Sequence, residues 1–154
     1  MEKLLIVRLG SMGDILHALP GATALRRAFP SAMIGWAVEE RWSELLCAPG
    51  AENAVSGCPQ KPLVDRLHFI NTVAWRNALF SDEMWKQAWM AMSDLRAVGY
   101  ELAVDFQGAW KSAGVALWSA APDRIGFTRP RERPAAMFYA RRVLTNSRHV
   151  VDQG

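Results

Sequence analysis

The stretch "LLIVRLGSMGDILHALPG" (residues 4–21) decides the fold, because it joins an apolar run to a helical segment through a glycine-containing turn. Residues 4–7 form a short apolar run that the turn ends, which is typical of a buried strand. After Asp14 the pattern becomes helical, and Pro20-Gly21 interrupts it. We expect either a short turn over 14–19 before a helix that begins near Pro20, or one helix kinked there.

The same alternation of apolar runs and helical patterns continues along the chain. Further strands are predicted at 33–38, 53–57, 102–106 and 124–127. Helices are predicted at 22–29, 39–48, 73–98, 109–121 and 135–143, and a loop at 58–72. Alternating strands and helices predict an α/β domain with a mostly parallel sheet and helices on both faces, with the first strand central. The 154 residues suit one domain.

The positions of the tryptophans predict which of them face the core, and the distribution of apolar residues predicts where the protein lies in the cell. Trp85, Trp89, Met92 and Leu95 form a stripe at helical spacing, so we expect them to face the core. Trp75 and Trp110 lie near the ends of their predicted helices, and for these two a ligand-facing role is a hypothesis. No apolar run approaches the roughly 20 residues of a membrane helix, and the first residues lack the pattern of a secretory signal, so we expect a cytoplasmic protein.

Positive charge is concentrated late in the chain. Residues 124–148 hold seven arginines and one glutamate, whereas the chain as a whole has a net charge of +3. Such a segment suits phosphates, acidic sugars, nucleic acid or an anionic membrane surface. A solvated arginine face explains it equally well.

The turn "GSMGD" is the first candidate site. Its spacing matches neither of the familiar glycine-rich nucleotide motifs, so a dinucleotide site is weakly supported. Asp14 at a helix start is explained most simply as a cap, although a carboxylate at a strand end is also able to accept a proton from a sugar hydroxyl. His17 lies three residues on and shares a helical face with Asp14, or it is a half-buried histidine bonded to the backbone. No metal-ligand spacing accompanies them.

The segment "DFQGAWKS" (105–112) is the second candidate. Gln107 and Lys111 follow a predicted strand, and Lys111 suits a phosphate or carboxylate, or else is an ordinary exposed helix lysine. Because ligands bind at the carboxyl ends of parallel strands, we expect both segments to meet at one cleft. That cleft is predicted to be lined by Ser11, Asp14, His17, Gln107 and Lys111.

Five ordered segments resemble the lipopolysaccharide heptosyltransferases of glycosyltransferase family 9. The N-terminal stretch 4–30 is the most diagnostic, and the others are "IGWAVEE" (34–40), "WRNALFS" (75–81), "AVDFQGAWKSAGVA" (103–116) and "RERPAAMFYARR" (131–142). The resemblance runs through all 154 residues and is greatest to heptosyltransferase I. It departs at Gly10, where the family often has a polar residue, and by one extra residue before the proline in the last segment.

The resemblance implies a Rossmann-like, mostly parallel sheet, the N-terminal acceptor-binding domain of a GT-B glycosyltransferase. Family enzymes are about twice as long, so the C-terminal nucleotide-sugar domain is expected to lie outside residues 1–154 and the chain alone to be inactive. Asp14 matches the family's catalytic base. The substrate-binding residues that the resemblance implies are Ser11, Met12, Gly13, His17, Arg76, Gln107, Lys111 and Arg131.

The implied reaction is an inverting, metal-independent transfer of heptose from ADP-L-glycero-D-manno-heptose to a Kdo residue of Kdo-lipid A. No cofactor and no nucleic acid are expected. The implied partners are ADP-heptose, the Kdo-lipid A acceptor and the cytoplasmic face of the inner membrane, at which the protein would be peripheral. Two alternatives stay open: a family 9 transferase with another acceptor such as heptose, and a non-catalytic α/β domain that binds an anion or nucleic acid.

Overall fold

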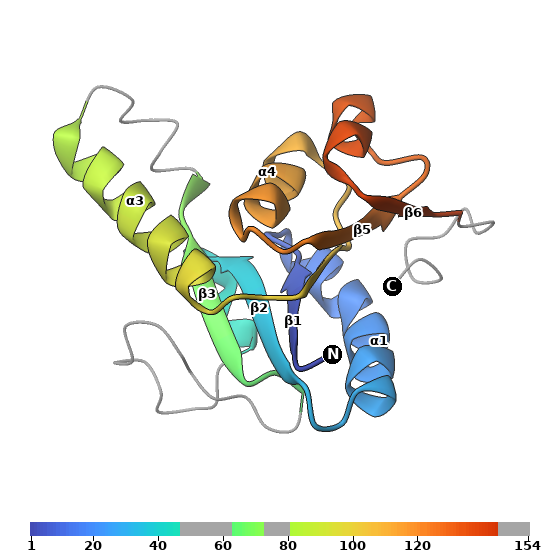
Figure 1. Cartoon of the computed structure of the whole chain (residues 1–154). Helices are drawn as coiled ribbons and strands as arrows, with labels where there is room; N and C mark the ends of the chain where they lie inside the picture. Colours follow the sequence, from blue (N-terminus) through green and yellow to red (C-terminus); the bar gives the residue numbers. More distant parts are fainter. Residues whose placement is uncertain (47–62, 73–80, 145–154) are drawn as a thin grey trace.

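A computed structural model describes residues 1–46, 63–72 and 81–144, which form an α/β layer structure (Figure 1). Within these residues the strands form one six-stranded sheet of order β3-β2-β1-β4-β5-β6, and every pairing in it is parallel. The strands are β1 (Lys3–Val7), β2 (Met33–Glu39), β3 (Arg66–Ile70), β4 (Leu102–Asp105), β5 (Asp123–Phe127) and β6 (Arg141–Val143). The predicted α/β fold with a central first strand is therefore confirmed.

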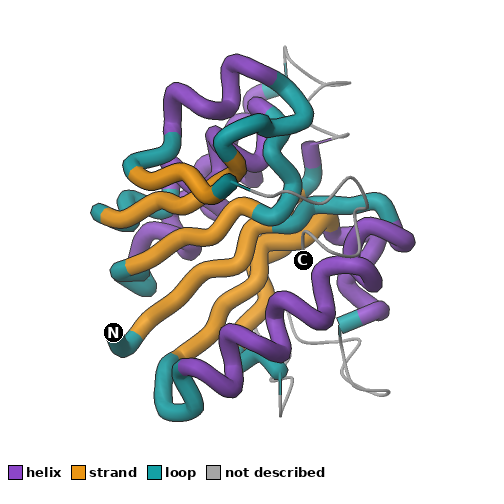
Figure 2. Tube along the Cα trace, turned by 90° about the vertical axis from the view of Figure 1, so that its right-hand side faces the viewer, coloured by secondary structure: helices purple, strands orange, loops and turns teal. Residues whose placement is uncertain are grey.

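Helices cover both faces of this sheet, as Figure 2 shows from the side. The helical segments in the described ranges are α1 (Met12–Ala28), α3 (Asp82–Ala97) and α4 (Trp110–Trp118), with the 3-10 turns η1 (Glu40–Leu45) and η2 (Arg133–Phe138). None of these helices is long and apolar enough to cross a bilayer.

The apolar run of β1 is explained by burial on both faces. Leu4 and Ile6 belong to the core beneath α1, whereas Leu5 and Val7 belong to the core beneath α3 and α4. All four side chains are fully buried. Successive strand residues point to opposite faces, so a strand covered by helices on both sides is apolar throughout.

Pro20 lies inside a continuous helix. Helix α1 runs without a break from Met12 to Ala28, so of the two expectations the single helix is confirmed. Apolar residues on both sides of Pro20, Ile15 and Ala22 among them, are buried against the sheet. Packing of this face outweighs the one backbone hydrogen bond that proline cannot make.

The loop predicted at 58–72 is wrong where it covers β3. The polar residues Arg66 and His68 hide the apolar alternation, yet His68 is 2% exposed and β3 pairs with β2 along its length. His68 is buried because Asp94 and Tyr100 hydrogen-bond both of its ring nitrogens, at 3.0 and 2.7 Å. The strand predicted at 53–57 lies outside the described residues.

Two of the predicted helices are replaced by other elements. In place of a helix over 39–48 the chain forms the 3-10 turn η1, and in place of one over 135–143 it forms η2 followed by strand β6. Tyr139 separates these last two elements. Its ring covers Gly126 so closely that a Cβ atom there would lie 2.4 Å from it. This contact lies between residues thirteen positions apart, so no local sequence pattern encodes it.

The tryptophan stripe of α3 is only half buried. Met92 and Leu95 face the core as predicted, but Trp85 and Trp89 are 60% and 66% exposed, so that part of the prediction is wrong. Trp89 instead makes an edge-to-face contact with Trp118 of α4, with ring centroids 6.4 Å apart. Helical spacing identifies a shared face but not how much of that face its neighbours cover.

Candidate functional site

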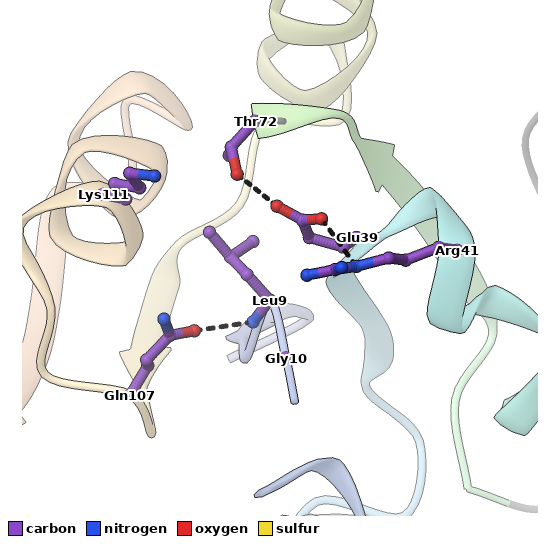
Figure 3. A pocket seen from close by; sticks show the side chains of 7 residues that line it. All are labelled: Leu9, Gly10, Glu39, Arg41, Thr72, Gln107 and Lys111. Atoms are coloured by element: carbon purple, nitrogen blue, oxygen red, sulfur yellow. Dashed lines mark hydrogen bonds and ion pairs between the residues drawn. The ribbon is translucent and has the colours of Figure 1, made fainter. Parts of the chain in front are cut away.

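A pocket of about 330 Å³ lies at the carboxyl ends of the four strands β1 to β4 (Figure 3). Each strand or the turn after it contributes to the lining, together with η1 and the first turn of α4. The lining residues are Leu9, Gly10, Glu39, Arg41, Thr72, Gln107 and Lys111. The strand order changes direction between β1 and β4, and such switch points are where doubly wound sheets bind ligands.

Asp105, the last residue of β4, organises the turn into α4. Its buried carboxylate accepts four hydrogen bonds, from the backbone N–H groups of Gln107 and Gly108 and from the hydroxyls of Ser112 and Tyr139, at 2.6 to 3.1 Å. Burial raises the pKa of Asp105, and these hydrogen bonds act in the opposite direction. The turn is thereby held in one arrangement beside the pocket.

Gln107 joins the two strand-end loops that the sequence singled out. Its side-chain oxygen accepts the Leu9 backbone N–H at 2.9 Å. The side-chain nitrogen therefore points away from Leu9, on the side of the pocket where Lys111 lies (Figure 3). The Lys111 ammonium lies 5.9 Å from the ring of Trp110, which is itself 58% exposed. Gln107 and Lys111 together make one wall of hydrogen-bond donors.

Glu39 forms the opposite wall. It is the last residue of β2 and is 6% exposed. The Thr72 hydroxyl donates a hydrogen bond to Glu39 Oε1, and Arg41 Nε lies 3.2 Å from Oε2. These two groups compensate for much of the hydration that the carboxylate loses on burial.

Asp14 lies in the first turn of α1, in contact with two groups. Arg8 Nη2 is 2.9 Å from Asp14 Oδ1, and the Ser11 backbone N–H donates to Oδ2 at 3.0 Å. Arg8 is buried and also donates to the Phe106 carbonyl, next to Gln107. Burial lowers the pKa of Arg8, and Asp14 acts against that shift. The Asp14 carboxylate is therefore both a helix cap and the partner of a buried cation, with 27% of its side chain still exposed.

The structure brings together part of the predicted site. Gln107 and Lys111 line the pocket, and so does Gly10, whereas Ser11, Met12, Gly13, Asp14 and His17 are not among its lining residues. Met12 and His17 are exposed on the first two turns of α1. Asp14 is joined to the pocket wall through Arg8 and Phe106.

Two further predicted residues are placed differently. The exposed Arg131 belongs to a loop that packs on the β4–α4 turn, since a Cβ atom at Gly108 would lie 3.1 Å from the Arg131 nitrogen. Gly108 has a φ of 67°, which favours glycine there. Arg76 and Trp75 lie outside the described residues.

The residues that the sequence analysis missed are Arg8, Glu39, Arg41, Thr72 and Asp105. Glu39 directly follows the predicted strand 33–38, and Asp105 is the penultimate residue of the predicted strand 102–106, so the rule that sites lie at carboxyl ends points to both. Arg8 is a charged residue directly after an apolar strand, which is a weaker signal of the same kind. Thr72 gave no signal, because strand β3 before it was not predicted.

The chain is similar in sequence to known heptosyltransferases. Residues 89–154 match the family described as glycosyltransferase family 9 (heptosyltransferase). The chain is 30% identical over 154 residues to lipopolysaccharide heptosyltransferase 1 of Salmonella typhimurium, covering 98% of this chain and 45% of that protein. The enzyme of the same name from Escherichia coli K12 matches equally well, at 30% identity. The chain thus spans somewhat less than half the length of these curated relatives.

Solved structures of family 9 glycosyltransferases are similar to this chain in fold. A structure of E. coli heptosyltransferase WaaC with ADP-2-deoxy-2-fluoro heptose superposes with a TM-score of 0.82 at 29% identity, covering 98% of this chain and 45% of that one. A family 9 glycosyltransferase from Veillonella parvula superposes at 0.70 with 16% identity, which shows the fold alone. The described sheet therefore has the fold of part of a GT-B glycosyltransferase, and in sequence and fold this chain is similar to the lipopolysaccharide heptosyltransferases of glycosyltransferase family 9.

Proposed function

We propose that this chain is the acceptor-binding, base-carrying part of a lipopolysaccharide heptosyltransferase. The reaction is the transfer of heptose from ADP-L-glycero-D-manno-heptose to a Kdo residue of Kdo-lipid A, with inversion and without a metal ion. The observation that supports it most is the Arg8–Asp14 pair beside a polar pocket at the switch point of the sheet. Similarity to the curated heptosyltransferases supports the choice of reaction.

Asp14 is the general base of the proposed reaction. As the acceptor hydroxyl attacks the anomeric carbon, its proton passes to the Asp14 carboxylate, and the bond to the nucleotide diphosphate breaks on the opposite face of the sugar. Arg8 and the Ser11 N–H hold the carboxylate in one orientation, and its exposed edge remains available to a substrate. Positioning of this kind is what an efficient proton transfer requires.

We assign the nucleotide sugar mainly to a second domain beyond these 154 residues. The relatives that this chain matches are about twice its length, and the structures of E. coli WaaC were obtained with ADP and with an ADP-heptose analogue. In this arrangement residues 1–154 contribute the acceptor side of an interdomain cleft. Ser11, Met12, Gly13, His17, Arg76, Gln107, Lys111 and Arg131 remain proposed contacts to substrate.

We place the proposed enzyme at the cytoplasmic face of the inner membrane, and a group of exposed arginines supports this location. Arg129, Arg131 and Arg133 are exposed beside the β4–α4 turn, and arginine binds phosphate and carboxylate groups well. The lipid A phosphates and the Kdo carboxylates are ligands of that kind.

Substitution of the base tests the proposal. In an enzyme that contains this chain together with its nucleotide-sugar domain, Asp14→Asn should lower heptose transfer about 10²- to 10⁴-fold or more, because asparagine cannot take the proton. Asparagine keeps the size of aspartate and much of its capping ability. If Asp14 were only a helix cap, the variant would therefore show a small change in melting temperature and normal turnover. Turnover and thermal unfolding measured on the same variant separate the two roles. Near-wild-type transfer would return Asp14 to the role of a helix cap.

A further inference from the structure

The two walls of the carboxyl-end pocket carry opposite hydrogen-bonding chemistry (Figure 3). Lys111 offers ammonium donors on one side, next to the amide nitrogen of Gln107. Glu39 offers carboxylate oxygens on the other. A ligand that fills this pocket is therefore selected for an acidic group at one end and for hydroxyl donors at the other.

Glu39 is built into the pocket wall. The side chain ends strand β2, and the Thr72 hydroxyl and Arg41 Nε occupy one position on each carboxylate oxygen. An ionised carboxylate offers about four lone-pair positions. Positions therefore remain for hydroxyl groups of a ligand, and because Thr72 and Arg41 fix the carboxylate, a ligand loses little entropy in orienting it.

Arg41 contributes to the wall from its edge. Its side chain is 62% exposed and lies over the Trp42 ring, with 5.1 Å from the guanidinium carbon to the ring centroid. The ion pair with Glu39 therefore lies at the boundary between core and solvent. The carboxylate is the buried partner, and its position rather than that of Arg41 shapes the interior of the pocket.

We propose that Glu39 is a specificity-determining residue of this pocket, accepting hydrogen bonds from hydroxyl groups of the acceptor sugar while Lys111 and Gln107 bind the acidic group. The inference rests on the proposed function, which supplies an acidic sugar as acceptor. Neither the sequence motifs nor the resemblance assigned a role to Glu39. Its contribution is to binding and selection, and the proton transfer remains with Asp14.

Binding of a small acceptor probe to the full 154-residue chain tests this inference without any need for turnover. The probe is the methyl ketoside of Kdo, with a set of its monodeoxy analogues, titrated by calorimetry or by NMR. Glu39→Gln should weaken binding of the ketoside about ten-fold or more, because a hydrogen bond to a charged acceptor is replaced by one to a neutral amide. Glu40→Gln is the matched control, since Glu40 is exposed and does not line the pocket, and it should bind as the wild type does.

The deoxy analogues identify the hydroxyl concerned. For the analogue that lacks the hydroxyl bound by Glu39, the wild type and Glu39→Gln should bind equally, whereas for the other analogues the ten-fold difference persists. Thr72→Val is the second variant, and it should weaken ketoside binding several-fold because the carboxylate loses the group that orients it. Equal affinity of wild type, Glu39→Gln and Thr72→Val for the ketoside would overturn the inference alone. Absence of ketoside binding by the wild type would overturn the acceptor assignment and this inference with it.

Discussion

At the scale of single residues, His68 and Asp105 are buried polar side chains that hydrogen-bond with specific partners. His68 is the clearest case, since Asp94 and Tyr100 bond its two ring nitrogens and Arg66 pairs with the other oxygen of Asp94. Burial lowers the pKa of His68 to about 4, a shift that Asp94 opposes and Arg66 reinforces. The imidazole is therefore neutral in the folded protein at neutral pH.

This depressed pKa predicts a loss of stability in weak acid. Below pH 6.5 the unfolded chain binds a proton at His68 that the folded protein does not accept until about pH 4. The free energy of unfolding should therefore fall as pH drops from about 6.5 to 4, by up to about 3 kcal/mol from this group. Urea denaturation at half-unit intervals of pH measures it. His68→Gln, which does not titrate, should show a shallower slope in this interval, and an unchanged slope would contradict the assignment.

At the scale of elements, the β4–α4 turn depends on Asp105. One carboxylate satisfies two backbone N–H groups and two hydroxyls, and the Tyr139 hydroxyl among them ties η2 and β6 to the same turn. Glu132 adds a second tie, since its side chain accepts the Trp110 backbone N–H at 2.8 Å. The turn that presents Gln107 and Lys111 is thus fixed by residues from a distant segment of the chain.

Removal of that carboxylate should be strongly destabilising. Asp105→Ala leaves several buried donors without an acceptor, so the free energy of unfolding should fall by about 3 kcal/mol or more. Tyr139→Phe removes one of the four hydrogen bonds and should cost about 1 to 2 kcal/mol. Chemical denaturation measures both, with Asp123→Ala as the control, because its pair with the exposed Arg141 is worth less than about 1 kcal/mol. Equal effects of Asp105→Ala and Asp123→Ala would show that the turn does not depend on Asp105.

At the scale of the whole molecule, the described part of the basic segment 124–148 holds arginines that bind groups of the protein itself and arginines that are exposed to solvent and form no ion pair within the described residues. Arg124 donates to the carbonyls of Ala121 and Phe138, and Arg141 pairs with Asp123. Arg129, Arg131 and Arg133 are exposed beside the turn that carries the pocket wall. Some of these arginines therefore hold β5 and η2 together, and the others form a basic surface.

That surface should govern binding to anionic vesicles. Reversal of Arg129, Arg131 and Arg133 to glutamate should abolish cosedimentation with vesicles rich in phosphatidylglycerol, and the binding of the wild type should weaken steeply between low and physiological salt. The matched control reverses Arg27, Lys86 and Arg96, which are exposed on α1 and α3. It changes the net charge equally and should retain binding. Loss of binding in both triple variants would indicate an effect of net charge and contradict a localised surface.

The sequence by itself determined the layer structure and half of the site. The apolar run of β1, the helical pattern after Asp14 and the strand before Gln107 are local signals, because a strand buried on both faces and a helix with one buried face leave their periods in the chain.

Only the tertiary structure decided the features that have no local period in the sequence. Strand β3 is hidden because its polar residues pair with Asp94 of α3 and with Tyr100, the Tyr139 ring packs on Gly126 from thirteen positions further along the chain, and Trp85 and Trp89 of α3 are more than half exposed. Glu39 and Thr72 meet at the pocket because β2 and β3 pair in parallel and end together, which depends on contacts between residues more than thirty positions apart.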